Sequence, residues 1–376
     1  EAFDRTVNEF PADARFVRLN LWGCLYADDG SPTGTVWYDA LALAPAAGGD
    51  NLVTGGDFEP RDPASLVPEF DWTAWDAAMT RAMDEHHFNS FRLRVPGMGG
   101  GTFHARYEPN LLGYGEDTPE YTAAFSNYCR LLQTHLQEKG WLREAYVYWF
   151  DEPDPKDYAF VMNGFRKLKR YLPKVDRMLT EQVEPDLVGG PNLWCPVSHN
   201  YDHEAAEERR AAGDRFWWYV CTGPKTPYAG LFIDHPGTEL RVWLWQTWKR
   251  KIEGVLVWTT NYWTSRAAYP DPDRPQNPYE DPMGWVSGYS TKEGVRRPWG
   301  NGDGRFVYPP ESCANADPDG PVLDGPVDSL RWEMLRDGIE DYEYLAILRR
   351  LLAEKGDRLS ADDRARYEAL LEVPET

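Results

Sequence analysis

The strongest constraint on the fold is an alternation of strand and helix patterns that begins near residue 60. Its clearest strand covers residues 145–150, where six apolar or aromatic residues in a row are typical of a strand buried on both faces of a parallel sheet. Further strand candidates cover residues 91–95, 177–182, 187–194, 215–221, 254–259 and 305–308. Because helical periodicity separates most of them, we expect parallel strands joined by helices.

Strands and helices in this number fit a (β/α)8 barrel of the TIM type, which takes about 250 residues. A doubly wound open sheet is the alternative, but the glycine-rich loop at residues 97–101 lacks the GxGxxG spacing of that fold. The first barrel strand is not evident and is expected between residues 51 and 67. We therefore predict a (β/α)8 barrel over residues 51–325.

The two ends of the chain show other patterns. Residues 16–21 and 35–43 read as two strands, which indicates a partial β-sandwich over residues 1–50. Two strands do not form a stable sandwich alone, so further strands are expected from elsewhere. At the other end, an apolar helical face between residues 335 and 352 predicts helices packed on the barrel over residues 326–376.

Composition excludes several classes of partner. The formal net charge is −21 and no basic run of five residues occurs, which argues against nucleic acid and anionic membrane surfaces. No apolar run approaches the ~18 residues of a membrane span. The five cysteines form no CxxC pair, so neither a metal site, a cofactor nor a disulfide framework is expected.

The sequence starts at Glu1, so a leader or a larger N-terminal part is expected to have been removed. A leader would imply an extracellular or periplasmic protein, and its absence a cytoplasmic one. The sequence decides neither the location nor the oligomeric state.

The strand at residues 145–150 runs into Asp151 and Glu152, and Pro153 stops it. The acidic pair thus lies at the carboxyl end of a strand, where α/β proteins bind ligands. Two carboxylates suggest general acid–base chemistry, commonly glycoside hydrolysis. Adjacent carboxylates rarely flank a sugar, but they suit substrate-assisted hydrolysis, in which the sugar's 2-acetamido oxygen attacks C1. A helix N-cap or a structural salt bridge is the alternative.

Residue types that bind sugars follow several predicted strands, and aromatic residues make up 14% of the chain. Aromatic rings stack on sugar faces, and amides bond to hydroxyls. Tyr228 and Tyr262 are of this type. The residues that we predict to bind substrate are Asn192, Trp194, Trp218, Tyr219, Trp258, Asn261 and Trp263.

Four motifs resemble glycoside hydrolase family 123 over roughly residues 65–350. They are YWFDEP at residues 148–153, WTTNYW at 258–263, GDGRFVYP at 302–309 and LRWEMLRDGIEDYEYL at 330–345. Members are exo-acting N-acetyl-β-galactosaminidases with a β-sandwich before a (β/α)8 barrel. The N-terminal sandwich of this chain looks shorter than theirs.

The resemblance implies release of terminal β-linked N-acetylgalactosamine, with retention, through an oxazolinium intermediate. Asp151 would orient the 2-acetamido group, and Glu152 would be general acid and then base. Trp258, Asn261 and Trp263 match the family's barrel-mouth motif, so the resemblance favours substrate contact there. The motif at residues 330–345 is expected to tie its helix to the barrel.

Two other functions stay open at this point. Glu181 also follows a predicted strand and could act as nucleophile opposite Glu152 in a conventional two-carboxylate β-glycosidase, which would need no 2-acetamido group. The second is a carbohydrate-binding barrel without catalysis, which would bind a glycan but release no product.

Overall fold

The computed structural model describes residues 6–7, 40–45, 47–53, 62–264, 277–280, 282–287, 297–314 and 324–374. The chain divides into two compact units, Glu1–Leu66 and Val67–Thr376. In the first unit, Asp62 caps the short 3-10 helix η1 (Pro63–Ser65), and the Asn51 side chain accepts a hydrogen bond from the backbone N of Leu43. The predicted strand at residues 16–21 and most of the one at 35–43 lie outside the described residues.

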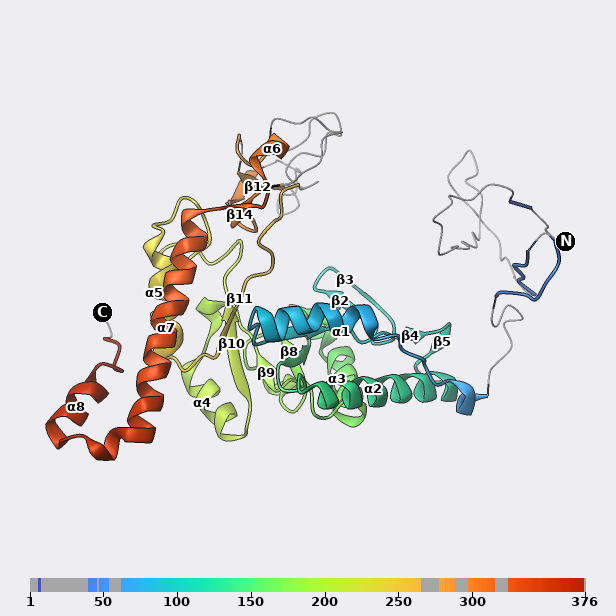
Figure 1. Ribbon diagram of the computed structural model, residues 1–376, viewed down its shortest axis with the longest axis horizontal. Helices are drawn as coiled ribbons and strands as arrows, with labels where there is room; N and C mark the ends of the chain where they lie inside the picture. The colour runs from blue at the N-terminus through green and yellow to red at the C-terminus, as the bar shows by residue number, and fades with distance from the viewer. Residues whose placement is uncertain are drawn as a thin grey trace. The chain divides into compact units, whose positions relative to one another are not determined.

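The second unit is built on a six-stranded parallel sheet (Figure 1). Its order is β1 (Phe91–Leu93), β6 (Ala145–Val147), β8 (Asp176–Leu179), β9 (Leu193–Trp194), β10 (Arg215–Tyr219) and β11 (Gly254–Leu256). Spatial order equals chain order, so every crossover moves to the next strand in the same direction. The result is a curled sheet that forms half of a barrel.

The predicted full (β/α)8 barrel is not confirmed in the part of the chain that the structure describes. The seventh candidate strand, at residues 305–308, forms β14 (Val307–Tyr308), which pairs antiparallel with β15 (Val327–Asp328) outside the parallel sheet. Pro309 and Pro310 follow at once and donate no backbone hydrogen bond, which limits the length of this strand. The fold is therefore mixed α/β with a parallel half-barrel.

The remaining strands are short. β2 (Gly100–Thr102) pairs with β3 (Ala105–Tyr107) and, in parallel, with β7 (Phe150–Asp151). Two further hairpins are formed by β4 (Asn110–Leu111) with β5 (Tyr114–Gly115) and by β12 (Met283–Ser287) with β13 (Arg297–Asn301).

Local sequence signals explain where the helices begin and end. The side chains of Thr118, Asp202, Ser329 and Ser360 each accept a backbone N–H in the first turn of the helix that follows. Gly140 ends the helix that Thr118 begins, in the left-handed conformation at φ 78°. The helices are α1 (Thr73–Thr80), which continues into the π-helical turn Arg81–Glu85, α2 (Pro119–Lys139), α3 (Tyr158–Tyr171), α4 (His203–Ala211), α5 (Thr238–Lys249), α6 (Glu311–Ala314), α7 (Leu330–Lys355) and α8 (Ala361–Ala369).

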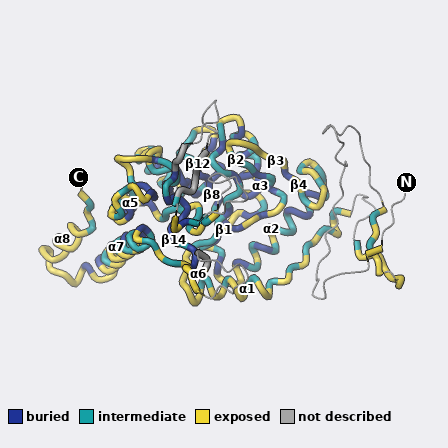
Figure 2. The backbone as a smooth tube through the Cα atoms, turned by 90° about the horizontal axis from the view of Figure 1, so that it is seen from above, coloured by how far each residue is buried: buried dark blue, intermediate teal, exposed yellow. Residues whose placement is uncertain are grey.

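The two faces of the sheet bury different residues, because side chains alternate along each strand. Val147, Leu179, Trp194 and Trp218 belong to the large apolar cluster between sheet and helices, the outer layer. A smaller cluster on the inner face holds Met178, Leu193, Cys195 and Tyr219, and partly buried Tyr146, Tyr148 and Trp217 pack against it. In Figure 2 the strands of the sheet are mostly buried, whereas α8 is exposed.

The motif at residues 330–345 opens α7, which runs alongside α5 (Figure 1). Gly338 lets the two helices approach, since a Cβ there would lie 3.0 Å from the Cα of Arg241. Arg241 pairs with Asp341 through two hydrogen bonds of 2.5 and 2.9 Å, and Trp245 donates to the same carboxylate at 2.8 Å. These contacts therefore hold α7 against α5, one of the helices that cover the sheet, as expected.

None of the helices that the structure describes has the length and hydrophobicity of a membrane-spanning segment.

Candidate active site

The Asp151–Glu152 pair lies where the predicted strand at residues 145–150 changes partner. β6 pairs with β1 and β8, then β7 pairs with β2, and Thr102 stands opposite Asp151 in that register. Asp151 is the last residue of β7, and Glu152 follows at φ 41°. The pair is therefore at the carboxyl end of its strand, as predicted from the sequence.

The backbone conformation at Glu152 explains why the side chains of two consecutive residues lie on the same face of the sheet. Consecutive side chains of a regular strand point to opposite faces. Glu152 instead adopts a left-handed conformation, which costs a non-glycine residue roughly 1–2 kcal/mol. As a result, both carboxylates bond to tyrosines of the inner face: Tyr148 donates to Asp151 Oδ1, and Tyr219 donates to Glu152 Oε1.

Thr180, the residue after β8, links the two acids. Its Oγ1 donates to Asp151 Oδ1 at 3.1 Å and accepts the backbone N–H of Glu152 at 3.0 Å. Among the described residues, neither carboxylate pairs with a lysine or an arginine, and neither side chain caps a helix. The described residues therefore support neither alternative role for the pair, a structural salt bridge or a helix N-cap.

Burial sets the protonation behaviour of Glu152. It raises the pKa of Glu152, and the charge of Asp151 adds to this, while the hydrogen bond from Tyr219 works in the opposite direction. Burial and the adjacent carboxylates also raise the pKa of Tyr148 and that of Tyr219, so both phenols keep their protons and act as donors. Glu152 is thus suited to hold a proton at higher pH than a free glutamate.

Glu181 is a third acid at this edge of the sheet. Burial raises its pKa to about 7, with smaller contributions from Glu184 and Glu152. Glu181 is therefore close enough to Glu152 for their charges to interact, and it is largely protonated below neutral pH.

The family model for the glycoside hydrolase 123 catalytic domain matches residues 105–348, well over half of the chain, and this range includes both carboxylates. The chain belongs to glycoside hydrolase family 123. The resemblance carried by the four sequence motifs is thereby confirmed.

One solved structure with a similar chain is a family 123 glycoside hydrolase from Clostridium perfringens, studied for the hydrolysis of glycolipid glycans. It is 17% identical, with a TM-score of 0.47, and the match covers 81% of this chain and 49% of that one. The present chain thus spans about half the length of that relative. None of the curated proteins matches this chain.

Of the predicted substrate-binding residues in this family 123 chain, Tyr219 lies with the pair, but three others do not. Trp194 and Trp218 point into the outer layer, where their Nε1 atoms donate to Asp214 and Thr247. Asn192 precedes β9 and bonds to the backbone N of Arg177 and to Asp176, at the amino edge of the sheet. The structure therefore does not bring these three together with the carboxylates.

The segment after β11 holds the remaining predicted residues. The side chain of Trp258 is 40% exposed, and its Nε1 lies 3.2 Å from both carboxylate oxygens of Asp303. Asn261 is exposed and forms an isolated backbone bridge with Arg305. Trp263 donates to the carbonyl of Val307 at 2.8 Å. All three therefore connect the WTTNYW motif to the GDGRFVYP motif.

Asp303 was not predicted from the sequence, although it lies in a family motif. Its side chain is fully buried, and burial raises its pKa to about 6 against the hydrogen bonds from Trp258 and the backbone of Gly304. Burial raises the pKa of Cys221, and the charges of Asp303 and Glu152 add to this. Tyr148 and Thr180 were also not predicted. A signal existed for each, because both stand near strand ends beside the pair.

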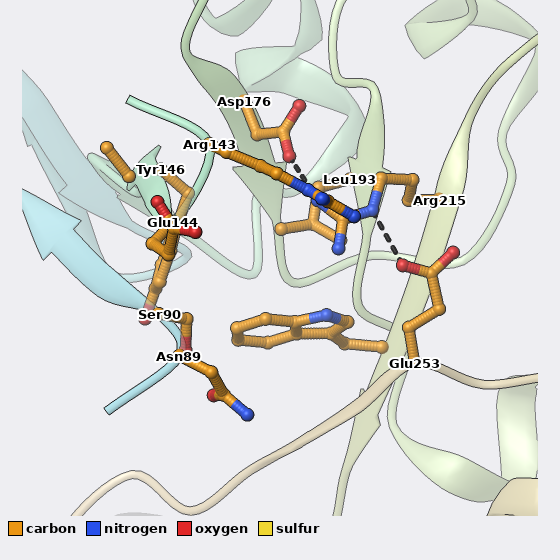
Figure 3. Close-up of a pocket in the computed structure, with 11 residues that line it drawn as sticks. Asn89, Ser90, Arg143, Glu144, Tyr146, Asp176, Leu193, Arg215 and Glu253 are labelled. Carbon is orange, nitrogen blue, oxygen red and sulfur yellow. Dashed lines mark hydrogen bonds and ion pairs between the residues drawn. The ribbon is translucent and has the colours of Figure 1, made fainter. Parts of the chain in front are cut away.

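The opposite edge of the sheet carries a polar cavity of 270 Å³ (Figure 3). Arg215 bridges Asp176 at 2.5 Å and Glu253 at 2.7 Å there. The residues that line this cavity stand at or just before the amino ends of the six parallel strands, so the cavity is separate from the carboxylate pair. Among the described residues, no group of three or more His, Cys, Asp or Glu side chains is arranged to hold a metal ion.

Proposed function

We propose that this family 123 domain hydrolyses the bond of a terminal β-linked N-acetylgalactosamine, with retention, by substrate-assisted catalysis. The observation that carries the proposal is the side-by-side arrangement of Asp151 and Glu152, with both carboxylates directed to the inner face through Tyr148 and Tyr219. Acids placed in this way can reach neighbouring positions of one sugar, the 2-substituent and the glycosidic oxygen.

Asp151 would act on the acetamido group. Both of its donors, Tyr148 and Thr180, bond to Oδ1, and within the described part of the chain Oδ2 has no hydrogen-bond partner. Oδ2 can therefore accept the acetamido N–H and turn the amide oxygen towards C1. A carboxylate there also offsets the positive charge of the oxazolinium ion.

Glu152 would carry the proton. As the acetamido oxygen bonds to C1, the C1–O bond to the leaving group breaks and the Glu152 proton moves to the leaving oxygen. Water then attacks C1, Glu152 takes its proton, and the C1 bond to the acetamido oxygen breaks. Two inversions at C1 give net retention.

Sugar contacts are proposed for Trp258, Asn261 and Tyr219. The exposed ring of Trp258 offers a stacking surface, and Asn261 offers an exposed amide. Tyr219 already holds Glu152. Trp263 is proposed to support the segment that carries Trp258 and Asn261, through its hydrogen bond to Val307.

The conventional mechanism with Glu181 as nucleophile has less support. A nucleophile must be ionised, whereas burial raises the pKa of Glu181 to about 7. At a mildly acidic working pH this carboxyl group would be protonated.

The first test is release of nitrophenol from the β-N-acetylgalactosaminide, the β-galactoside and the β-N-acetylglucosaminide. Turnover of the first substrate alone supports the proposal. Turnover of the plain galactoside would assign the nucleophile to the protein and point to Glu181. Binding without release would make the domain a carbohydrate-binding barrel.

Variants of the pair test the assigned roles. We expect Glu152→Gln to lower kcat by about 10²–10⁴-fold on substrates with poor leaving groups, because the general acid is lost. Asp151→Asn should slow acetamido-containing substrates by a similar factor. Asp154→Asn, a partly exposed carboxylate of the following loop, is the matched control and should retain activity. Wild-type rates in both site variants would refute the assignment.

A further inference from the structure

A second hollow lies on the outer side of the sheet, away from the carboxylate pair. Its volume is 990 Å³, and residues from the loops after β9 and β10, from α5 and from the C-terminal segment line it. Five aromatic rings take part: Tyr201, Trp218, Tyr228, Trp243 and Trp245. We call this hollow the aromatic groove.

One of these rings is exposed to solvent, and the nitrogen atom of another has no hydrogen-bond partner among the described residues. Tyr228 is 47% exposed, and the centroid of its ring lies 5.8 Å from that of His199. Trp243 is buried, and its Nε1 has no hydrogen-bond partner among the described residues. By contrast, Trp218 and Trp245 donate to Thr247 and Asp341. Because Trp243 Nε1 is itself buried, Tyr228 is the ring of the two that is open to a ligand.

The charge of the aromatic groove is opposite to that of the chain. Lys249, Arg250, His199 and His203 line it, whereas none of its lining residues is an aspartate or a glutamate. The whole chain carries a formal charge of −21. The acids next to this lining in sequence are Asp202, Glu204 and Glu372. Asp202 caps α4 by accepting the backbone N–H of Ala205 at 3.0 Å, and all three are exposed.

We infer that the aromatic groove is a second carbohydrate-binding site, one that takes an acidic glycan segment bearing carboxylate or sulfate groups. Rings that stack on sugar faces and cations that bind oxyanions are the combination such a ligand requires. Lys249 Nζ also donates to the carbonyl of Pro374 at 2.9 Å. A neutral glycan would form no ion pair with Lys249 or Arg250, and a bare anion would not stack on the rings.

The position of the groove agrees with this ligand. His199 and Tyr228 follow β9 and β10, so this part of the groove's lining comes from the edge of the sheet at which Glu152 also lies. The choice of a glycan rests on the proposed function, since a glycosidase domain encounters such chains. Binding to the groove does not require turnover at Asp151 and Glu152.

Calorimetric titration of the chain carrying Glu152→Gln, which prevents turnover, tests the inference. The probes are a chondroitin sulfate hexasaccharide, its desulfated form and a neutral galacto-oligosaccharide. We expect the acidic probes to bind at least tenfold more tightly than the neutral one. The desulfated form distinguishes carboxylate recognition from sulfate recognition. Binding should persist in excess N-acetylgalactosamine, which occupies the catalytic site.

Variants locate the binding. Tyr228→Ala and Arg250→Gln should each weaken binding of the acidic probe by fivefold or more. Tyr344→Ala, which removes a 72% exposed ring on α7, and Arg366→Gln on α8 are matched controls and should leave it unchanged. Thermal unfolding verifies that all four variants fold. With Glu152 restored, nitrophenyl glycoside turnover should be unchanged in the two groove variants.

Several outcomes would overturn the inference. Equal affinity for acidic and neutral probes would remove the role of charge. Unchanged affinity in both groove variants, or complete displacement by N-acetylgalactosamine, would assign binding to another site. Absence of any binding would exclude a glycan site in the groove. Failure of nitrophenol release with intact groove binding would count against the proposed function alone.

Discussion

Glu152 shows how a few atoms around one residue set its chemistry. Burial and the neighbouring Asp151 raise its pKa, and the phenol of Tyr219 opposes them by donating to Oε1. A donor to a carboxylate stabilises the ionised form. Tyr219 therefore tunes the acidity of the proposed general acid in addition to orienting it.

Replacing Tyr219 by Phe should raise the pKa of Glu152 further. The alkaline limb of kcat/KM, which reports the acid in the free enzyme, should move up by about one pH unit, the equivalent of one hydrogen bond to a charged group. The measurement is a pH–rate profile on a nitrophenyl β-N-acetylgalactosaminide.

Tyr148→Phe is the matched control, because Tyr148 donates to Asp151 and not to Glu152. It should lower kcat and leave the alkaline limb near its wild-type position. If both variants shifted the limb equally, the proton would not reside on Glu152.

At the scale of elements, α7 supports from a distance the ring of Trp258, a proposed sugar contact. Arg331, in the first turn of α7, donates to the carbonyls of Leu231, Gly302 and Arg305 at 2.5–2.6 Å. The loop fixed in this way carries Asp303, which holds Trp258. Two family motifs far apart in sequence thus position one exposed ring.

Gly304→Ala should displace that ring. Gly304 has φ 74°, and a Cβ would lie 2.7 Å from Cζ2 of Trp258. We expect kcat/KM on the N-acetylgalactosaminide to fall about tenfold, through KM, as the loss of ~1.4 kcal/mol of stacking would give. Steady-state kinetics measure it.

Gly113→Ala controls for the backbone effect, since Gly113 has φ 87° and no atom within 4 Å of its Cβ position. Both variants should lose about 1 kcal/mol of stability from the left-handed conformation. If kcat/KM fell as much in Gly113→Ala as in Gly304→Ala, a specific role for Trp258 would be disproved.

For the molecule as a whole, buried carboxyl groups couple stability to pH. The folded-state pKa of Asp303 is raised from 3.8 to about 6. A raised pKa means that the folded protein holds this proton more tightly than the unfolded chain does. The corresponding stability is fully present below pH 4 and is lost as the pH rises through 6.

Comparison of wild type with Asp303→Asn isolates this contribution from the other acids. The free energy of unfolding of wild type, minus that of the variant, should fall between pH 4 and pH 7, by at most about 3 kcal/mol. Urea unfolding at several pH values measures it. The same difference for Asp357→Asn, whose side chain is 99% exposed, should change little over this range. A flat difference for Asp303→Asn would contradict the raised pKa.

The sequence by itself determined the local features of this protein. The run of apolar residues at 145–150 ended by Asp151, Glu152 and Pro153 placed the acidic pair at the carboxyl end of a strand. Six of the strand candidates form the parallel sheet, and capping residues such as Thr118 and Ser329 stand where the helices begin. These features follow from residues close together in the chain, and the family motifs are local in the same sense.

Only the tertiary structure decided which side chains meet. Trp218 and Tyr219 are neighbours that equally favour sugar binding, yet strand alternation sends Trp218 outward and Tyr219 to Glu152. Asp303 reaches Trp258 across 45 residues of sequence. Closure of the predicted barrel is not confirmed in the described residues, where β14 pairs with β15 outside the parallel sheet. Pairing between distant segments depends on packing of the whole chain, which no local pattern records.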